Sequence, residues 1–310
     1  MVDLNTLSLP QLFETLTADG SLQRLLEAAR AEDLAEIGDV TTASLVAGGV
    51  TARARGVARA GGVVAGTAAI GVILEAFGCT TRSTIMTSDG TQCTGGQGLW
   101  QLEGPRAEIL TVERTLLNII SRLSGIATET SRYVQRIAGS GAVVCDTRKT
   151  TPGLRSIEKY AVRCGGGTLH RLGLYDALLI KDNHRAHLRP DELTAAITEA
   201  CRRGRERYDL RFVEIEVDTL SELEQVLRCP PGLIDIVLLD NMTVGELSEA
   251  VRVRDGCDGR VQLEASGGIT LDNVRAVAET GVERISVGAI TQSAPAMDVA
   301  MEMEQLIRDQ

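Results

Sequence analysis

Apolar and polar residues alternate in a regular rhythm along the second half of the chain. Six short runs with strand character recur, at 142–145, 177–180, 212–217, 234–239, 261–265 and 284–287. The segments between them carry helix-start signals. Pro190 suits a first helical turn, and Thr219 and Thr243 each have a glutamate three residues later, as in a capping box. Strands that alternate with helices predict parallel βα units, which form either an open doubly wound sheet or a barrel.

The first half has a different pattern. A helical pattern covers 21–35, and a stretch at 49–77 that is rich in Gly, Val and Ala contains strand-like pieces. Apolar residues then recur at intervals of three and four from Leu116 to Ile137, which predicts a long helix. We therefore place a domain boundary at 139–141, after this helix, and expect the chain to close with a further helix at 294–307.

The composition narrows the class of protein. The chain has 310 residues, of which 44% are apolar and 3% aromatic, and its 32 basic and 42 acidic side chains give a net charge of −10. This balance argues against a nucleic-acid partner. The N-terminus has no signal-peptide pattern, and the longest uncharged stretch, 60–74, is shorter than the roughly 20 residues that span a membrane. Seven cysteines without a C-x-x-C pair favour reduced thiols, so we expect a cytoplasmic protein with no membrane partner.

Charge is distributed unevenly along the chain. Residues 146–189 hold nine Lys or Arg against four acidic residues, a local charge of +5 in a chain whose remainder carries −15. His170, His184 and His187, which are all the histidines of the chain, lie in the same segment. One interpretation is a solvated basic face. The other is an anion site, which would concentrate a negatively charged substrate in one cleft of an acidic protein.

Charged residues or glycines stand at the end of each of the six runs. Because ligands of parallel α/β folds bind at the carboxyl ends of the strands, this pattern predicts a ligand site. In the third run, Glu214, Glu216 and Asp218 share one face, and carboxylates on a covered face need cations nearby. Lys181 and Asp240, which end neighbouring runs, supply a counter-charge and a further carboxylate. The alternative is an edge strand with a hydrated face.

Glycine turns and basic residues also indicate anions. The Ser-Gly-Gly run at 266–268 precedes Thr270, where we expect a helix to begin, and together with Gly288 after the last run it resembles a phosphate cradle. A second glycine run, 165–167, is either another cradle or a flexible turn. The basic group implies a multiply anionic substrate and consists of Arg148, Lys149, His170, Arg171 and Lys181. Carboxylates of the third and fourth runs could then hold Mg²⁺.

Several motifs, in chain order, resemble those of the quinolinate phosphoribosyltransferase family. They include Asp-Thr-Arg-Lys at 146–149, His-Arg-Leu-Gly at 170–173, Lys-Asp-Asn-His at 181–184 and Glu-Ala-Ser-Gly-Gly at 264–268, with further matches at 38–42, 113–118, 123–128 and 239–241. The resemblance implies a type II phosphoribosyltransferase fold of the α/β class. An N-terminal α/β sandwich domain at 1–139, including the long connecting helix, would precede an incomplete parallel α/β barrel of six or so strands at 140–290. A C-terminal helix at 291–310 would pack back on the first domain.

The resemblance also assigns roles to individual residues. Lys149, Glu216 and Asp240 would be catalytic, and Glu216 and Asp240 would bind Mg²⁺ and the ribose hydroxyls of phosphoribosyl pyrophosphate. The protein would be a homodimer or hexamer with shared sites, in which the partner's Arg114 reaches the quinolinate pocket. The pocket itself would contain Thr147, Arg148, Lys149, His170, Arg171 and Lys181. The 5′-phosphate would bind at Ser266, Gly267, Gly268, Val287, Gly288 and Ala289.

Two positions depart from the family's pattern. Gln292 stands where members often have His, next to the last phosphate-binding turn, and Leu169 stands where bacterial members commonly have Asn. Neither position belongs to the basic group itself.

The implied reaction transfers a phosphoribosyl group to the ring nitrogen of quinolinate, with loss of diphosphate and CO₂, and gives nicotinate mononucleotide for de novo NAD biosynthesis. Lys149 or His170 would protonate the carbon that loses CO₂. The alternatives are a molybdenum-transport-associated paralogue of the same fold, a Schiff-base barrel lyase that uses Lys181, and a non-catalytic binding module. The paralogue lacks the Lys-Asp-Asn-His run found here, and a binding module leaves the pair Glu216 and Asp240 unexplained.

Overall fold

A computed structural model describes residues 2–257 and 261–304 of the chain. Within these residues the chain forms two compact units, each assembled from separate segments. Unit 1 comprises residues 2–6, 132–149 and 167–289, and unit 2 comprises residues 7–131, 150–166 and 290–304. Each unit is described by itself below.

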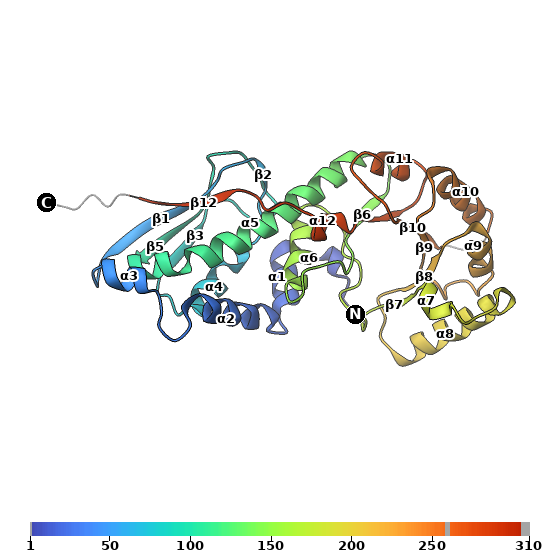
Figure 1. Ribbon diagram of the computed structural model, residues 1–310. Coiled ribbons are helices and arrows are strands. Elements are labelled where there is room, and N and C mark those ends of the chain that lie inside the picture. Colours follow the sequence, from blue (N-terminus) through green and yellow to red (C-terminus); the bar gives the residue numbers. More distant parts are fainter. Residues whose placement is uncertain (1, 258–260, 305–310) are drawn as a thin grey trace. The chain divides into compact units, whose positions relative to one another are not determined.

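Unit 1 is built on a six-stranded sheet in which every neighbouring pair of strands is parallel (Figure 1). The six predicted runs are confirmed as its strands: β6 (Val143–Cys145), β7 (Leu178–Ile180), β8 (Val213–Val217), β9 (Ile236–Asp240), β10 (Gln262–Ser266) and β11 (Arg284–Ser286). Their order in the sheet is β6-β11-β10-β9-β8-β7. Neighbouring strands are therefore consecutive in the chain, except for the pair β6 and β11. Within the described residues, a pairing of β6 with β7 is all that is missing for a closed barrel. This is the incomplete barrel, and it decides between the two architectures that the periodicity allowed.

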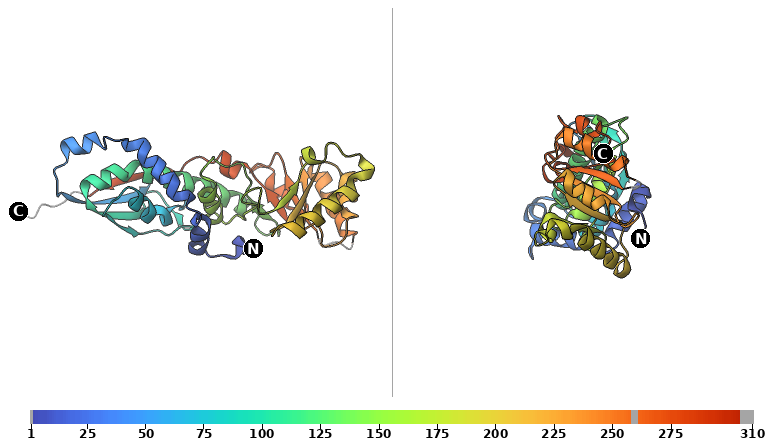
Figure 2. Two further views of the ribbon diagram at one scale, coloured as in Figure 1. Left: turned by 90° about the horizontal axis from the view of Figure 1, so that it is seen from below. Right: turned by 90° about the vertical axis from the view of Figure 1, so that its right-hand side faces the viewer.

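Helices follow the strands and lie along the outside of this sheet (Figures 1 and 2). They are α7 (Asp182–Arg185), the short helix at Pro190–Glu192, α8 (Leu193–Arg207), α9 (Leu220–Leu227), α10 (Val244–Asp255) and α11 (Val274–Ala278). The capping box at α10 is confirmed, because Thr243 N–H donates to Glu246 Oε2 at 2.8 Å and Thr243 Oγ1 accepts from Glu246 N–H. At α9 only half of it forms, since Thr219 Oγ1 accepts from Glu222 N–H while the Glu222 carboxylate accepts from another residue.

Unit 2 contains an antiparallel sheet of order β12-β1-β5-β3. Its strands are β1 (Thr51–Ala58), β3 (Arg82–Ile85), β5 (Gly98–Pro105) and β12 (Val299–Met303), and β2 (Gly62–Val63) pairs separately with β4 (Gln92–Cys93). The helices of this unit include α1 (Leu9–Thr17), α2 (Ser21–Leu34), α3 (Val40–Leu45), α4 (Ile70–Ala76) and α6 (Arg155–Cys164). Trp100 and Leu102 on β5 are fully buried, so the unit has an apolar core of its own.

The predicted helix at 294–307, and with it the C-terminal helix of 291–310, is wrong. Residues Val299–Met303 form strand β12, which pairs with β1 in the register Ala54 to Met303 and Val57 to Ala300. Val299, Met301 and Met303 alternate with less apolar neighbours, the two-residue period of a strand, and β1 offers a free edge for backbone hydrogen bonds. Residues 305–310 of the predicted helix lie outside the described residues.

The long helix predicted before the domain boundary is confirmed as α5 (Arg106–Arg136). The division between the two units falls inside it, after Ser131. Helix α6, which the sequence places in the 140–290 segment, packs in unit 2 against α1. Tyr160 of α6 meets Phe13 of α1 edge to face at 5.2 Å, and its hydroxyl donates to Asp89 at 2.8 Å. The fold of unit 2 is therefore not contiguous in sequence.

All seven cysteines lie within the described residues, and none of them forms a disulfide. None of the described helices has the length and hydropathy needed to cross a membrane.

Candidate active site

The candidate site lies at the carboxyl ends of the strands of unit 1. Lys181 follows β7 directly, Glu216 and Asp240 lie at the ends of β8 and β9, and Ser266 closes β10. The register pairs Ser266 with Asp240, so that neighbouring strands end at nearly the same level. Because parallel strands end at one edge of their sheet, residues far apart in sequence come together there. Every predicted site residue except Arg114 belongs to this unit.

Lys181 and Glu216 form an ion pair between Nζ and Oε2. The side chain of Glu216 is 6% exposed and that of Lys181 is 42% exposed, so the ammonium group reaches the carboxylate from the solvent side. Strand β8 lies between β7 and β9 and is buried along its whole length, which excludes the hydrated edge strand. Lys181 is thus the counter-charge for a carboxylate on the inner face of the sheet.

Asp240 is fixed beside the glycine turn that follows β10. Its Oδ2 accepts a hydrogen bond from Nδ2 of Asn241 at 2.7 Å, and Asn241 has a left-handed backbone with φ of 54°. A Cβ atom at Gly267 would lie 2.2 Å from Oδ1 of Asn241, so this turn requires glycine. The predicted metal ligand and the predicted phosphate turn therefore occupy adjacent strand ends.

The turn after β10 is a loop and not the start of a helix. Gly267 and Gly268 have φ of 88° and 61°, and Asn273 Nδ2 donates to Gly268 O at 2.9 Å. The helix expected to begin at Thr270 begins instead at Val274, because Asn273 ties the loop with its side chain and Thr270 N–H donates to its Oδ1 at 2.8 Å. Any phosphate held here would therefore be bound by loop backbone and not by a helix N-terminus.

Lys149 packs on the second glycine turn, after β11. A Cβ atom at Gly288 would lie 2.8 Å from Cδ of Lys149, so the lysine stem passes directly over the turn. The N–H of Lys149 donates to Oγ1 of Thr147 at 3.0 Å. The N–H of Val287 donates to the end of β6 at 2.9 Å, and Ala289 begins the short helix α12 (Ala289–Gln292). The predicted catalytic lysine and the predicted phosphate residues are thus neighbours.

Two guanidinium groups influence each other in this site. Arg171 is 7% exposed, and burial together with the nearby charge of Arg148 lowers its pKa. Its backbone is held by the following turn, in which the N–H groups of Leu172 and Gly173 donate to Asp176 at 2.8 and 2.9 Å. Two neighbouring cations, one of them buried, favour a bound anion of more than one charge.

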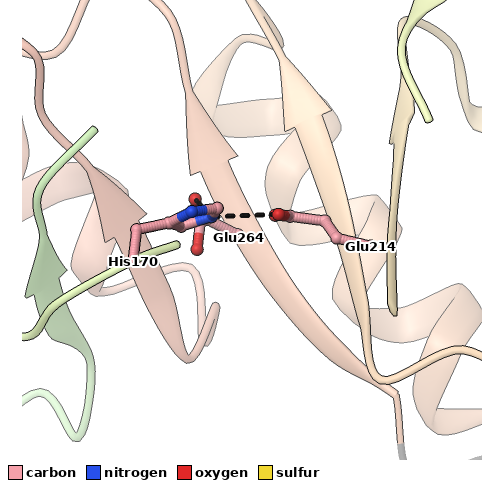
Figure 3. Close-up of side chains that lie close together, drawn as sticks. All are labelled: His170, Glu214 and Glu264. Atoms are coloured by element: carbon pink, nitrogen blue, oxygen red, sulfur yellow. Dashed lines mark ion pairs between the residues drawn. The ribbon is translucent and has the colours of Figure 1, made fainter. Parts of the chain in front are cut away.

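His170 lies further inside the sheet than these arginines. Its backbone N–H donates to Oδ1 of Asp146 at 2.8 Å. Its Nε2 lies 2.9 Å from Oε2 of Glu214 and 3.4 Å from Oε1 of Glu264, as Figure 3 shows. Arg284 Nε donates to the other oxygen of Glu264 at 2.7 Å. Burial alone would lower the pKa of His170, but Glu264 and Glu214 raise it to about 10.

The sequence did not single out Glu264 or Arg284 as site residues, and it indicated Glu214 only as one of three carboxylates on a covered face of the third run. The available signal was strand alternation: Glu214 lies two residues before Glu216, and Glu264 two residues before Ser266, so each shares a face with a predicted site residue. The pairing of β10 with β11, which places Arg284 opposite Glu264, is decided by the sheet and not by sequence spacing.

The remaining predicted residues are placed as follows. Arg114 is exposed on α5 in unit 2, so its role in a partner's pocket stays a prediction. Gln292 is exposed at the end of α12. Leu169 is buried, and its backbone N–H donates to Oδ1 of Asn5 at 2.7 Å. At Gly165 a Cβ atom would lie 2.3 Å from the carbonyl oxygen of residue 127, so close packing on α5 requires this glycine.

The fold and the site together define a class of protein: an incomplete parallel α/β barrel with basic side chains and glycine turns at its strand ends. Residues 126–302 match the C-terminal domain of quinolinate phosphoribosyl transferase, and residues 39–124 match the N-terminal domain of the same family. The chain therefore belongs to the quinolinate phosphoribosyltransferase family.

Individual relatives agree with this assignment over most of the chain. A nicotinate-nucleotide pyrophosphorylase [carboxylating] of Mycobacterium leprae is 40% identical over 274 residues, which are 88% of this chain and 93% of that protein. A probable enzyme of the same name from Bacillus subtilis is 37% identical over 91% of this chain and 93% of its own length. The solved structure of the nicotinate-nucleotide pyrophosphorylase from Francisella tularensis superposes with a TM-score of 0.83 at 34% identity and covers 98% of this chain and 100% of that one.

Proposed function

We propose that this protein transfers the phosphoribosyl group of phosphoribosyl pyrophosphate to quinolinate and releases diphosphate, CO₂ and nicotinate mononucleotide. The observation that carries the proposal is the arrangement of two anion sites on one sheet. Arg148 and buried Arg171 form the first, and the glycine turns at Gly267 and Gly288 form the second. The ion pair of Lys181 with Glu216 ends two neighbouring strands of the same sheet.

Quinolinate carries two carboxylates on adjacent ring carbons. In the proposed function Arg148, Arg171, His170, Lys149 and Lys181 bind them, with Thr147 beside Lys149. Arginine suits this role because its planar fork can donate two parallel hydrogen bonds to one carboxylate. The pairing of Lys181 with Glu216 means that a substrate carboxylate would compete with Glu216 for the ammonium group.

The sugar substrate would bind along the ends of β8 to β11. The turn residues Ser266, Gly267, Gly268, Val287, Gly288 and Ala289 would hold the 5′-phosphate through backbone N–H groups. Glu216 and Asp240 would hold the ribose hydroxyls and a Mg²⁺ ion. Their carboxylate oxygens fit this hard cation, which takes few protein ligands and completes its shell with water and diphosphate oxygens. A bound Mg²⁺ would neutralise charge on the leaving diphosphate.

The transfer of the phosphoribosyl group needs only positioning and electrostatic stabilisation from the protein. The lone pair of the quinolinate ring nitrogen forms the new bond to the anomeric carbon, and the bond to diphosphate breaks with its electron pair leaving on diphosphate. Glu216 and Asp240 would stabilise the positive charge that develops on the sugar. The carboxyl group next to the ring nitrogen then leaves as CO₂, and its electron pair stays on the ring carbon beside the positive nitrogen until a proton arrives.

Lys149 fits the role of proton donor better than His170. The lysine stem lies over the Gly288 turn at the strand ends, whereas Nε2 of His170 points to Glu214 and Glu264 inside the sheet. We therefore assign protonation of the ring carbon to Lys149 and carboxylate binding to His170.

The Schiff-base lyase is not favoured. A lysine that acts as a nucleophile is usually desolvated or placed beside another cation, whereas Lys181 is 42% exposed and paired with a carboxylate. The family assignment likewise does not favour the molybdenum-associated paralogue, because the relatives named above carry the pyrophosphorylase name.

The active protein would be a homodimer or larger assembly in which the partner's Arg114 completes the pocket. Mixing Arg114→Ala subunits with Lys149→Ala subunits should then restore part of the activity, since a heterodimer contains one pocket with both residues intact. Verified heterodimers without activity would contradict the shared pocket. The seven unpaired thiols fit the cytoplasm, which is the location that we propose.

The decisive assay incubates the protein with quinolinate, phosphoribosyl pyrophosphate and Mg²⁺ and measures nicotinate mononucleotide and CO₂. Nicotinate in place of quinolinate is the control, because it lacks the second carboxylate and should give little product. Product from nicotinate but not from quinolinate would refute the proposed substrate. Chelation of Mg²⁺ should abolish turnover and leave quinolinate binding in place.

A further inference from the structure

A layer of charged side chains lies beneath the proposed substrate site. Glu214 lies on β8 and Glu264 on β10, each two residues before a residue of the site and therefore about 7 Å further inside the sheet. Both side chains are completely buried. Arg284 lies opposite Glu264 on β11 and is 12% exposed. His170 enters this layer from the loop after α6.

The four groups balance each other in charge. Two carboxylates face one guanidinium and one imidazole, so the layer is neutral when His170 is protonated. Within the part of the chain that the structure describes, no hydrogen bond reaches either oxygen of Glu214 or Oε1 of Glu264, so His170 meets these atoms as an ion-pair partner. A buried ionic cluster of this kind is a poor source of stability, since apolar residues of similar volume usually serve as well or better. The stability of the fold therefore does not explain why these four charged residues are buried together.

These contacts instead fix the orientation of the imidazole ring of His170. Nε2 of His170 is directed at Glu214 and Glu264 at once (Figure 3), and the backbone N–H of His170 is held by Asp146. The ring also meets Phe212 edge to face at 5.0 Å. The ring is thus fixed by contacts from β8, β10 and the loop after β6, and none of these partners is a predicted substrate ligand.

We propose that Glu214 and Glu264 are positioning residues that hold His170 as an oriented imidazolium for the anionic substrate without touching the substrate themselves. This inference rests on the proposed function, in which His170 binds a carboxylate of quinolinate. Arg284 completes the layer by pairing with Glu264, so that the four charges balance when His170 is protonated.

A metal ion is the alternative occupant of the same three side chains, because their ligand atoms lie within 4.8 Å of one another. The ion pair of Glu264 with Arg284 favours a proton over a metal, because Arg284 already binds one oxygen of that carboxylate. Elemental analysis of the purified wild-type protein tests this directly. One equivalent of a tightly held transition metal whose removal changes the His170 signals would overturn the proposal.

Protonation of His170 is measured first on the wild-type chain, by NMR with ¹⁵N-labelled histidine. The chain has only three histidines, and His170→Asn identifies the signals of His170. Both ring nitrogens of His170 should carry protons at pH 7.5. A neutral His170 at this pH would overturn the proposal.

Kinetics of Glu214→Gln, Glu264→Gln and the double variant then test the positioning role. The KM for quinolinate should rise about tenfold or more, while the KM for phosphoribosyl pyrophosphate stays within about twofold. Glu264→Asp, which keeps the charge, should retain the imidazolium signals that the double variant loses. Glu103→Gln is the control, since Glu103 is exposed and pairs with Arg53 in unit 2, and it should leave both KM values unchanged.

The outcomes are distinguishable. An unchanged quinolinate KM in the double variant, or an equal rise of both KM values, would show a merely structural cluster and overturn the proposal. If the wild-type protein makes no nicotinate mononucleotide at all, the proposed function fails. The NMR experiment still reports whether the two glutamates hold His170 as a cation.

Discussion

Each unit contains an arginine and a glutamate that face each other across neighbouring strands. In unit 2, Arg53 on β1 lies in register with Glu103 on β5, and their charged atoms are 2.9 Å apart. In unit 1, Arg284 on β11 lies in register with Glu264 on β10 at 2.7 Å. The contacts are nearly identical in geometry. Their side chains are 45% and 58% exposed in the first pair but 12% and 0% exposed in the second.

This difference in burial gives the two pairs different roles. Water screens the Arg53 pair, so it contributes little beyond keeping an open sheet face soluble. The Arg284 pair has lost its water, and its charges must be matched inside the protein. His170 and Glu214 complete the charge balance around this buried pair. The resulting cluster lies beneath the proposed substrate site. A salt bridge therefore indicates function here through its burial and not through its distance.

The largest effect on stability is expected from breaking the buried pair. Arg284→Ala leaves Glu264 with one partner fewer in a dry environment and should lower the free energy of unfolding by about 3–5 kcal/mol. Chemical denaturation followed by circular dichroism measures this. A loss below about 1 kcal/mol would mean that water reaches the cluster, and the comparison between the two pairs would fail.

Replacement of Arg171, the buried arginine of the candidate site, should weaken the binding of quinolinate. Arg171→Ala is expected to cost about 2–5 kcal/mol of interaction with quinolinate, seen as a fall in kcat/KM for this substrate. Arg189→Ala is the matched control, because Arg189 is 71% exposed and pairs with Glu192 on the surface. Near-normal kinetics of Arg171→Ala would remove this residue from the site.

Stability should depend on pH through His170. Its pKa is raised from 6.5 to about 10 in the folded chain, so its contribution is complete below pH 6.5 and is lost as the pH rises towards 10. Between pH 7 and 8.5 the free energy of unfolding should fall by about 2 kcal/mol. The dependence should disappear in the Glu214→Gln, Glu264→Gln double variant. A wild-type protein that is equally stable at both pH values would contradict a buried imidazolium.

The smallest effect is expected at the surface pair. Arg53→Ala should change the free energy of unfolding by about 0.2–1 kcal/mol, and high salt should remove even this difference. The same salt should leave the effect of Arg284→Ala largely intact, because buried charges are screened much less. Equal salt sensitivity of the two variants would show that burial is not what separates the two pairs.

Much of the fold could be predicted from local patterns. The six strands of unit 1, the long helix α5 and the capping box at Thr243 follow from spacing alone, because they depend on neighbours a few residues apart. The C-terminal strand β12 could not be predicted in this way. Its five residues become a strand because β1, more than 240 residues earlier in the chain, offers an unpaired edge.

The candidate site likewise has features that the sequence predicts and features that only the structure shows. Motifs at the strand ends named Lys181, Glu216, Asp240 and the glycine turns, and the structure places all of them at one edge of the sheet. Lys149 against Gly288 and Asn241 against Gly267 are contacts between loops distant in sequence, and the second explains why the turn at Gly267 requires glycine. No spacing rule contains that information.

The sequence by itself determined the alternation of strands and helices, the +5 segment that holds every histidine, and the family to which its motifs belong. These properties depend on residue types and short periods. Only the tertiary structure decided that β6 pairs with β11 to leave the barrel open, and that Glu264 and Arg284 join His170 in a buried layer. The physical reason is that burial and charge balance are properties of a closed environment, and such an environment exists only once distant segments have packed together.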